Sequence, residues 1–358
     1  MRKGSVLEEQ FRQISAIALD PTACNESCSW ASQLSGHDLD TFLTLLADHH
    51  VTIRTLEPLL GTGAPALSWS DRARETLARE RERIRVSIEF LNGICTELES
   101  TGSRVVVFKT LDHWPDFGND LDLFVMGDEA CIRNILTEKF QGEEQVRSWG
   151  DHLAHKWSFR VPGCPADVEL HINRLGQAGE HFELARRFIS RRNYLFVNGH
   201  SLPVPAPEER VIAAALQRMY RHLYFRICDI VTLIRLMQSG ELSYQELAVA
   251  AEIGGVWPGV AGCLELVADY ANQFLTDPFV LPLELRATGK WNATQLRAHG
   301  RFLHIPFVPN GAELFCRQFA HVLGKGNLDA TARLSLLPPL ASAAALAYAV
   351  TGSNGRIW

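Results

Sequence analysis

The sequence of 358 residues lacks several features that would place it in a specialised class of protein. No apolar segment follows the basic residues of the N-terminal stretch MRKGSVLEEQF, so we expect neither a secretory signal nor an N-terminal anchor. The cysteines are scattered singly except for Cys24 and Cys28, whose spacing has no second pair to complete a tetrahedral zinc site. We therefore expect reduced, mostly buried thiols in a cytoplasmic protein.

An excess of positive charge is also missing. The formal net charge is −6, which argues against duplex nucleic acid as a partner, because such binding depends on neutralising phosphates.

The apolar stretch LSLLPPLASAAALAYAV near the C-terminus contains Pro338 and Pro339 and is shorter than the roughly 20 residues that a bilayer span requires. We predict a packed terminal helix and no membrane contact.

Changes of hydrophobic period along the chain divide it into three regions. Residues 1–102 are typical of helices, because apolar residues recur at helical spacing and a long charged run ends near Gly102. Residues 103–205 begin with the β-branched run RVVVFK and read as a small mixed α/β core. Residues 206–358 follow the proline-rich PVPAPEER and are mainly helical. The fold class predicted is α+β, with a small mixed β-sheet flanked by helical regions.

Three segments of this pattern bear on function. AHKWSFRVPGCPADVELHI predicts two strands joined through Pro162 and Gly163 as a hairpin. GDEACIRNILTEKF predicts a helix, and RVIAAALQRMYRHLYFRICDIVTLIRLM predicts one strongly apolar helix.

Two carboxylates interrupt the predicted strand NDLDLF. Residues two apart in a strand point to the same side, so Asp120 and Asp122 project together. Two ionised carboxylates so close repel each other unless a cation or a shared proton lies between them. Magnesium, bound through carboxylates and substrate phosphates, suits this pair best. The alternative is an edge strand with one wet face.

A second acidic strand, PADVELHI, places Asp167, Glu169 and His171 on one face. If it lies beside the first, Glu169 or Asp167 completes a triad of carboxylates. Such a triad can hold two metal ions, one activating a hydroxyl and one carrying the triphosphate of a nucleotide. His171 is either a catalytic group or a half-buried histidine bonded to its neighbours.

Lys109 and Thr110 end the first strand, ten residues before Asp120. We expect Lys109 to contact the terminal phosphates of a nucleotide as a point charge, and Thr110 to contact them through its hydroxyl and backbone amide. The alternative for Lys109 is a strand-end lysine whose stem is buried and whose ammonium reaches water.

The stretch FKTLDHWPDFGNDLDLFV followed by VELHI resembles the DNA polymerase β-type nucleotidyltransferase superfamily, and within it is similar to the uncharacterised nucleotidyltransferase family of bacteria. The resemblance covers residues 104–173 and extends more loosely to about 236. It implies that Asp120 and Asp122 bind magnesium, and that Glu169 is the third metal-binding carboxylate and the catalytic base. Lys109 and Thr110 would face the nucleotide phosphates.

The resemblance has two departures. Thr110 stands where the family has a glycine after its lysine, and Gly118 and Asn119 stand where many relatives carry an arginine and a glycine. Close backbone approach to phosphate depends on the missing glycine.

A second source of positive charge follows in ALQRMYRHLYFRICDI. Arg218, His222, Arg226 and Asp229 are spaced by four, four and three residues, which predicts one face of a helix turned toward the triphosphate. The alternative is an exposed face on which Arg226 pairs with Asp229.

His152, His155 and Lys156 leave a similar choice open. They are substrate contacts or residues of a loop and a strand edge.

These patterns predict a magnesium-dependent nucleotidyltransferase that moves a nucleoside monophosphate from a nucleoside triphosphate to a small-molecule or peptide acceptor and releases pyrophosphate. Two Mg²⁺ ions and the nucleoside triphosphate as co-substrate are implied. The alternatives are a non-catalytic, antitoxin-like binding or regulatory protein of nucleotidyltransferase shape, and a toxin that nucleotidylates protein or RNA.

Overall fold

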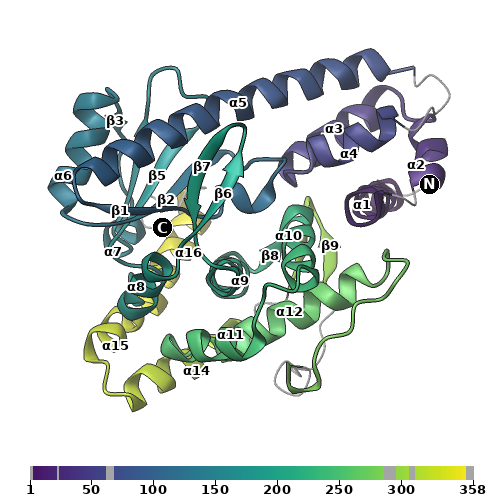
Figure 1. Ribbon diagram of the computed structural model, residues 1–358. Coiled ribbons are helices and arrows are strands. Elements are labelled where there is room, and N and C mark those ends of the chain that lie inside the picture. The colour runs from purple at the N-terminus through teal and green to yellow at the C-terminus, as the bar shows by residue number, and fades with distance from the viewer. Residues whose placement is uncertain (1–2, 22–23, 62–67, 286–295, 306–310, 352–358) are drawn as a thin grey trace.

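The fold is α+β, as the sequence predicts, with a five-stranded mixed sheet between two largely helical regions (Figure 1). The structure is a computed structural model that describes residues 3–21, 24–61, 68–285, 296–305 and 311–351. The division of the chain into domains at residues 102 and 205 stays a prediction.

The N-terminal region is helical and ends in one long helix that crosses the sheet (Figure 1). Its helices are α1 (Lys3–Leu19), α2 (Cys24–Ala31), α3 (Gly36–Asp48), α4 (Thr52–Gly61) and α5 (Ser70–Ser100). The charged face of α5 carries ion pairs three residues apart, such as Glu82 with Arg85 at 2.8 Å. Its buried face, which includes Ile88 and Leu91, packs in the same core as the sheet.

The central sheet has the strand order β1-β2-β5-β4-β3, in which only the β2–β5 pair is parallel. The strands are β1 (Arg104–Val107), β2 (Asp120–Met126), β3 (Glu143–Glu144), β4 (Lys156–Arg160) and β5 (Asp167–Ile172). The predicted hairpin is confirmed, because β4 pairs with β5 in antiparallel fashion. The predicted helix after β2 is also confirmed, as α6 (Glu129–Asn134) continued by η3 (Ile135–Lys139), and α7 (Trp149–Leu153) precedes β4.

The two faces of β2 belong to different cores. Leu121, Leu123 and Val125 are fully buried in the core that contains α5. Phe124 points the other way and lies edge-on to Phe188 of α8 (Phe182–Ser190), with ring centroids 6.3 Å apart. Since side chains alternate along a strand, Asp120 and Asp122 share the face of Phe124. Both carboxylates therefore turn away from α5, toward the C-terminal region.

The predicted single helix over residues 210–237 is wrong. The chain forms α9 (Pro207–Ala215), the π-helix η4 (Leu216–His222), the short strand β8 (Tyr224–Phe225) and then α10 (Ile227–Gln238). Leu223 interrupts the helix in the left-handed conformation, with φ at 56°. The physical reason lies far along the chain, because β8 pairs with β10 (Phe302–His304), which in turn pairs with β9 (Arg297–His299).

The remaining elements complete the helical C-terminal region. The hairpin of β6 (Asn193–Val197) and β7 (His200–Val204) precedes α9, and α11 (Tyr244–Ile253), α12 (Trp257–Ala271) and α14 (Ala312–Gly324) follow α10. α9, α10 and α12 share one core with the N-terminal helices.

The C-terminal helices correct another expectation. α15 (Leu328–Ser335) and α16 (Leu337–Thr351) form the predicted terminal helix, but beyond the buried Leu337 most of α16 is exposed, and Leu346 and Val350 are 68% and 76% exposed. By length and composition alone, Leu328–Thr351 could cross a membrane, although one such helix is a weak indication.

Candidate active site

The parallel pairing of β2 with β5 builds an acidic cluster. The register sets Asp122 opposite Glu169 and Asp120 opposite Asp167. Glu169, Asp120 and Asp122 line one cavity, whereas Asp167 lies outside its lining and pairs with Arg160 at 3.4 Å. Of the two carboxylates that the sequence left open, Glu169 is therefore the one that joins the two aspartates.

Four parts of the chain line the cavity, namely His50 and residues 109–122, 156–169 and 217–226. Its volume is about 210 Å³. All eight residues predicted to bind metal or phosphate line it, and the complete lining is His50, Lys109, Thr110, His113, Gly118, Asn119, Asp120, Asp122, Lys156, Glu169, Gln217, Arg218, Arg221, His222, Tyr224 and Arg226.

Cationic side chains of the protein neutralise the acidic cluster. Nζ of Lys109 lies 2.6 Å from Oδ1 of Asp122 and 4.0 Å from Oε1 of Glu169. Nζ of Lys156 lies 2.5 Å from Oε2 of Glu169, whose Oε1 lies 2.9 Å from Nε2 of His171. The cations that relieve the repulsion between these carboxylates are therefore ammonium groups of the protein itself, where the sequence led us to expect magnesium.

The carboxylates differ in their affinity for protons. Burial and the charges of Asp122 and Glu169 raise the pKa of Asp120 to about 6. Burial acts to raise the pKa of Glu169 too, but its hydrogen bond with His171 and the charges of Lys109 and Lys156 outweigh burial and hold that pKa well below its ordinary value. Glu169 is thus ionised at neutral pH.

The donor set fits a divalent cation. One ligand atom each from Asp122, Glu169 and His171 lie within 4.8 Å of one another. Two carboxylates with a third beside them, Asp120, suit a hard cation such as Mg²⁺. The ammonium of Lys109 occupies one side of this cluster, so a cation bound by Asp122 requires Lys109 to release that carboxylate.

Lys109 lies in a strained turn. Its φ is 69° and its ψ is −45°, and the amide of Thr110 donates to the carbonyl of Phe108 at 2.9 Å, which closes a three-residue γ-turn. The resemblance implies a glycine next to Lys109, at the place of Thr110. The chain forms the turn without that glycine. Strained residues of this kind cluster at functional sites.

Thr110 does not have the predicted phosphate-binding geometry. Its hydroxyl accepts a hydrogen bond from the amide of Asp122 at 2.8 Å and lies 3.3 Å from the carbonyl of Asp120. Since its own amide is also bonded within the turn, neither group is free for a ligand. Thr110 fixes the turn to β2 and thereby positions both aspartates.

A basic wall forms another part of the cavity lining. Arg218, Arg221, His222 and Arg226 all line it, although the break at Leu223 means that they do not share one helical face. His222 is not cationic, since burial and the neighbouring arginines lower its pKa to about 3. The charge of this wall comes from the arginines.

Arg218 is the most constrained residue of that wall. It is 1% exposed, and its Nε and Nη2 lie 2.7 and 3.0 Å from the two oxygens of Asp229. Its Nη1 has no hydrogen-bond partner within the described part of the chain. The side chain of Asp229 therefore pairs with Arg218, and from Arg226 it accepts a hydrogen bond of the backbone amide. The alternative in which the side chains of Arg226 and Asp229 pair on an exposed face is wrong. A buried guanidinium nitrogen without a partner at a cavity wall is suited to bind an anion.

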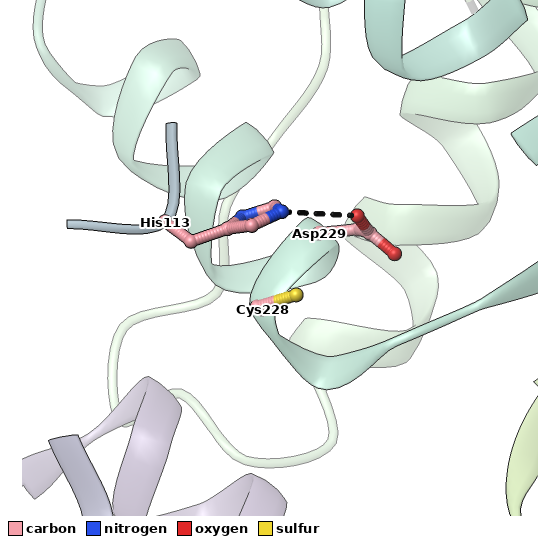
Figure 2. A group of neighbouring side chains, drawn as sticks. All are labelled: His113, Cys228 and Asp229. Atoms are coloured by element: carbon pink, nitrogen blue, oxygen red, sulfur yellow. Dashed lines mark ion pairs between the residues drawn. The ribbon is translucent and has the colours of Figure 1, made fainter. Parts of the chain in front are cut away.

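A second group with ligand-type side chains lies beside Arg218. Figure 2 shows the ring of His113 directed at Asp229, with Nε2 and Oδ1 3.9 Å apart, and Cys228 on the same helix as Asp229. Because Arg218 and the Arg226 amide take up both oxygens of Asp229, this group supports the guanidinium and has no carboxylate oxygen left for a metal. Burial raises the pKa of the Cys228 thiol well above its ordinary value, so the thiol is neutral.

Of the three further candidate residues His152, His155 and Lys156, one lines the cavity. Lys156 lines the cavity, but His155 faces Glu129 at 3.4 Å and His152 lies outside the lining. The sequence did not indicate five residues of the lining, His50, His113, Gln217, Arg221 and Tyr224. The available signal for Lys156 was its position on the strand next to β5, opposite His171.

Comparisons with known proteins identify no family for this chain. No protein-family model matches it, and no curated protein matches it. Among solved structures, it is similar to the crystal structure of an antigenic nucleotidyltransferase-like protein from Paracoccidioides brasiliensis, with 17% sequence identity and a TM-score of 0.30. The match covers 52% of this chain and 92% of that one. A likeness this weak carries no conclusion about function.

Proposed function

We propose that the cavity binds a nucleoside triphosphate with magnesium and transfers its nucleoside monophosphate to a hydroxyl of a small-molecule or peptide acceptor. The observation that supports this most is the charge distribution of one cavity. Three carboxylates and three arginines, Arg218, Arg221 and Arg226, line it together. A metal-bound polyphosphate needs both kinds of group within one small volume.

Each side chain has a defined role in this proposal. Asp120, Asp122 and Glu169 would hold magnesium, which when bound neutralises phosphate oxygens and favours ionisation of the acceptor hydroxyl. Lys109 would exchange Asp122 for a phosphate oxygen, and Arg218 and Arg221 would bind the remaining phosphate charge. The charge that moves onto the leaving pyrophosphate is then stabilised by groups already in place.

The reaction is a displacement at phosphorus. The acceptor oxygen bonds to the α-phosphorus, the bond from that phosphorus to the bridging oxygen breaks, and pyrophosphate leaves with the bridging oxygen. Glu169 takes the proton of the acceptor hydroxyl, since it is ionised at neutral pH.

Release of pyrophosphate tests the activity. We would incubate the chain with Mg²⁺, each of the four nucleoside triphosphates, and fractions of small hydroxyl compounds or peptides. Asp122→Asn should lower acceptor-dependent release on the order of a hundredfold or more. Asp167→Asn is the matched control, because it changes a carboxylate of the neighbouring strand outside the cavity. Equal activity of Asp122→Asn and the unsubstituted chain would contradict the proposal.

A second function is favoured by one observation. The ammonium of Lys109 at 2.6 Å from Asp122 lets the carboxylates persist without a metal ion. A non-catalytic protein that binds nucleotides through the arginine wall would show nucleotide binding that does not depend on Mg²⁺, and no release of pyrophosphate.

A further inference from the structure

A second, smaller cavity adjoins the first one. Its volume is about 50 Å³, and Lys109, Gln217 and Arg221 line both cavities. His171 lies in its wall and bonds to Glu169, which lines the first cavity. A molecule in the second cavity would therefore approach the carboxylate cluster from the side of His171.

The wall of the second cavity is mostly apolar. Phe108, Leu175, Ala213, Leu216 and Tyr220 supply it, and the first three are at most 6% exposed. The ring of Phe108 lies edge-on to His171, with centroids 5.3 Å apart, which fixes the side of the cavity next to the acidic cluster. A mostly apolar wall favours an apolar group over a heavily hydroxylated one, because the latter would lose hydrogen bonds with water.

Glu180 is the carboxylate among the polar residues that interrupt this apolar wall, which are Lys109, His171, Gln177, Glu180, Gln217 and Arg221. Glu180 is 5% exposed, and its Oε2 accepts the amide of Ala178 at 2.9 Å. Gly176 makes room for it, because a Cβ atom there would lie 2.2 Å from Oε2 of Glu180, and its φ of +100° favours glycine. The local sequence is thus built to keep a carboxylate in the wall of the second cavity.

We infer that the second cavity is the acceptor site of the proposed transfer, on which this inference rests. It takes a hydroxyl compound whose reacting oxygen is carried by a compact apolar group, such as a short branched aliphatic alcohol or a peptide side chain of that kind. The apolar group lies against Phe108, Leu175 and Ala213, and the hydroxyl is directed past His171 and Lys109 toward Glu169. Sugars and other polyols are poor occupants.

Two variants change the second cavity without touching the first. Ala213→Leu fills it from α9, and Leu216→Ala enlarges it, and neither residue lines the nucleotide cavity. The probe is 3-methyl-1-butanol, with glycerol as the polar control, and binding is followed by saturation-transfer NMR on the full chain. The melting shift with Mg²⁺ and nucleoside triphosphate reports on the first cavity independently.

The inference predicts saturation transfer to the methyl protons of 3-methyl-1-butanol and none to glycerol. Ala213→Leu should weaken the affinity for 3-methyl-1-butanol roughly tenfold, as expected when a pocket loses room for a few methyl groups. Leu216→Ala should retain binding. A nucleotide-dependent melting shift without any alcohol signal would overturn this inference alone. An alcohol signal that survives Ala213→Leu, or one in a chain that shows no nucleotide shift, would overturn the acceptor role.

Discussion

Nζ of Lys109 lies 2.6 Å from Oδ1 of Asp122, so an ammonium of the protein neutralises the carboxylate that is the candidate metal ligand. This contact connects a strained turn to the acidic cluster. It also means that binding of a divalent cation competes with an internal ion pair.

Replacing Lys109 should therefore strengthen binding of a divalent cation in the absence of nucleotide. We expect Lys109→Met to lower the Kd for Mn²⁺ roughly tenfold, because a neighbouring positive charge no longer repels the ion. Mn²⁺ titration followed by electron paramagnetic resonance measures this. Lys139→Met is the matched control, since Lys139 pairs with Glu97 on the surface. Unchanged affinity in Lys109→Met would show that the lysine does not compete for the site.

The γ-turn at Lys109 predicts a difference between two small substitutions. Both Lys109→Gly and Lys109→Ala remove the ammonium, but only glycine adopts a φ of 69° without strain. The glycine variant should be more stable than the alanine variant by about 1 kcal/mol. Urea denaturation of the pair measures the difference, and equal stabilities would argue against strain at this turn.

Arg218 should contribute to both stability and nucleotide binding. Arg218→Met leaves Asp229 buried without its partner, so we expect a loss of about 3–5 kcal/mol in the free energy of unfolding. The double variant with Asp229→Leu should recover most of that loss, because no unpaired charge remains. It should still lack the nucleotide-dependent melting shift, which a merely structural arginine would not affect. Recovery of the shift in the double variant would contradict the role in phosphate binding.

Buried His49 predicts a pH-dependent contribution to stability. Its Nε2 donates to the carbonyl of Arg301 at 2.7 Å, and its Nδ1 accepts the amide of Ile227 at 2.9 Å, an arrangement that only the neutral ring can make. Burial lowers its pKa to about 4, against roughly 6.5 in the unfolded chain. The stability that His49 contributes is therefore present above pH 6.5 and is lost as the pH falls toward 4.

The variant His49→Gln isolates this effect. Its destabilisation relative to the unsubstituted chain should shrink by about 2 kcal/mol between pH 7.5 and pH 5, because glutamine binds no proton in the unfolded state. Denaturant unfolding at both pH values measures the change. A destabilisation that is independent of pH would show that His49 does not stay neutral in the folded chain.

The sequence predicts four strands of the central sheet, β1, β2, β4 and β5, together with the carboxylate cluster, because these depend on local pattern, but it does not predict the strands that follow residue 173. Asp120, Asp122 and Glu169 could be assigned to shared strand faces from the period of two alone. The break at Leu223 could not be predicted, since apolar residues continue at helical spacing on both sides of it and its cause is pairing with Phe302–His304, about eighty residues away. The ion pair of Lys156 with Glu169 was not predicted, because it depends on the register between the neighbouring strands β4 and β5.

The first experiment is thermal melting with each nucleoside triphosphate, once with Mg²⁺ and once with EDTA, which tests whether these carboxylates bind a metal–nucleotide complex. We expect one nucleotide to raise the melting temperature by about 2 °C or more only with Mg²⁺. Asp122→Asn should abolish this shift, and Asp167→Asn should retain it. A shift that persists in EDTA, or in Asp122→Asn, would contradict a metal–nucleotide site at these carboxylates.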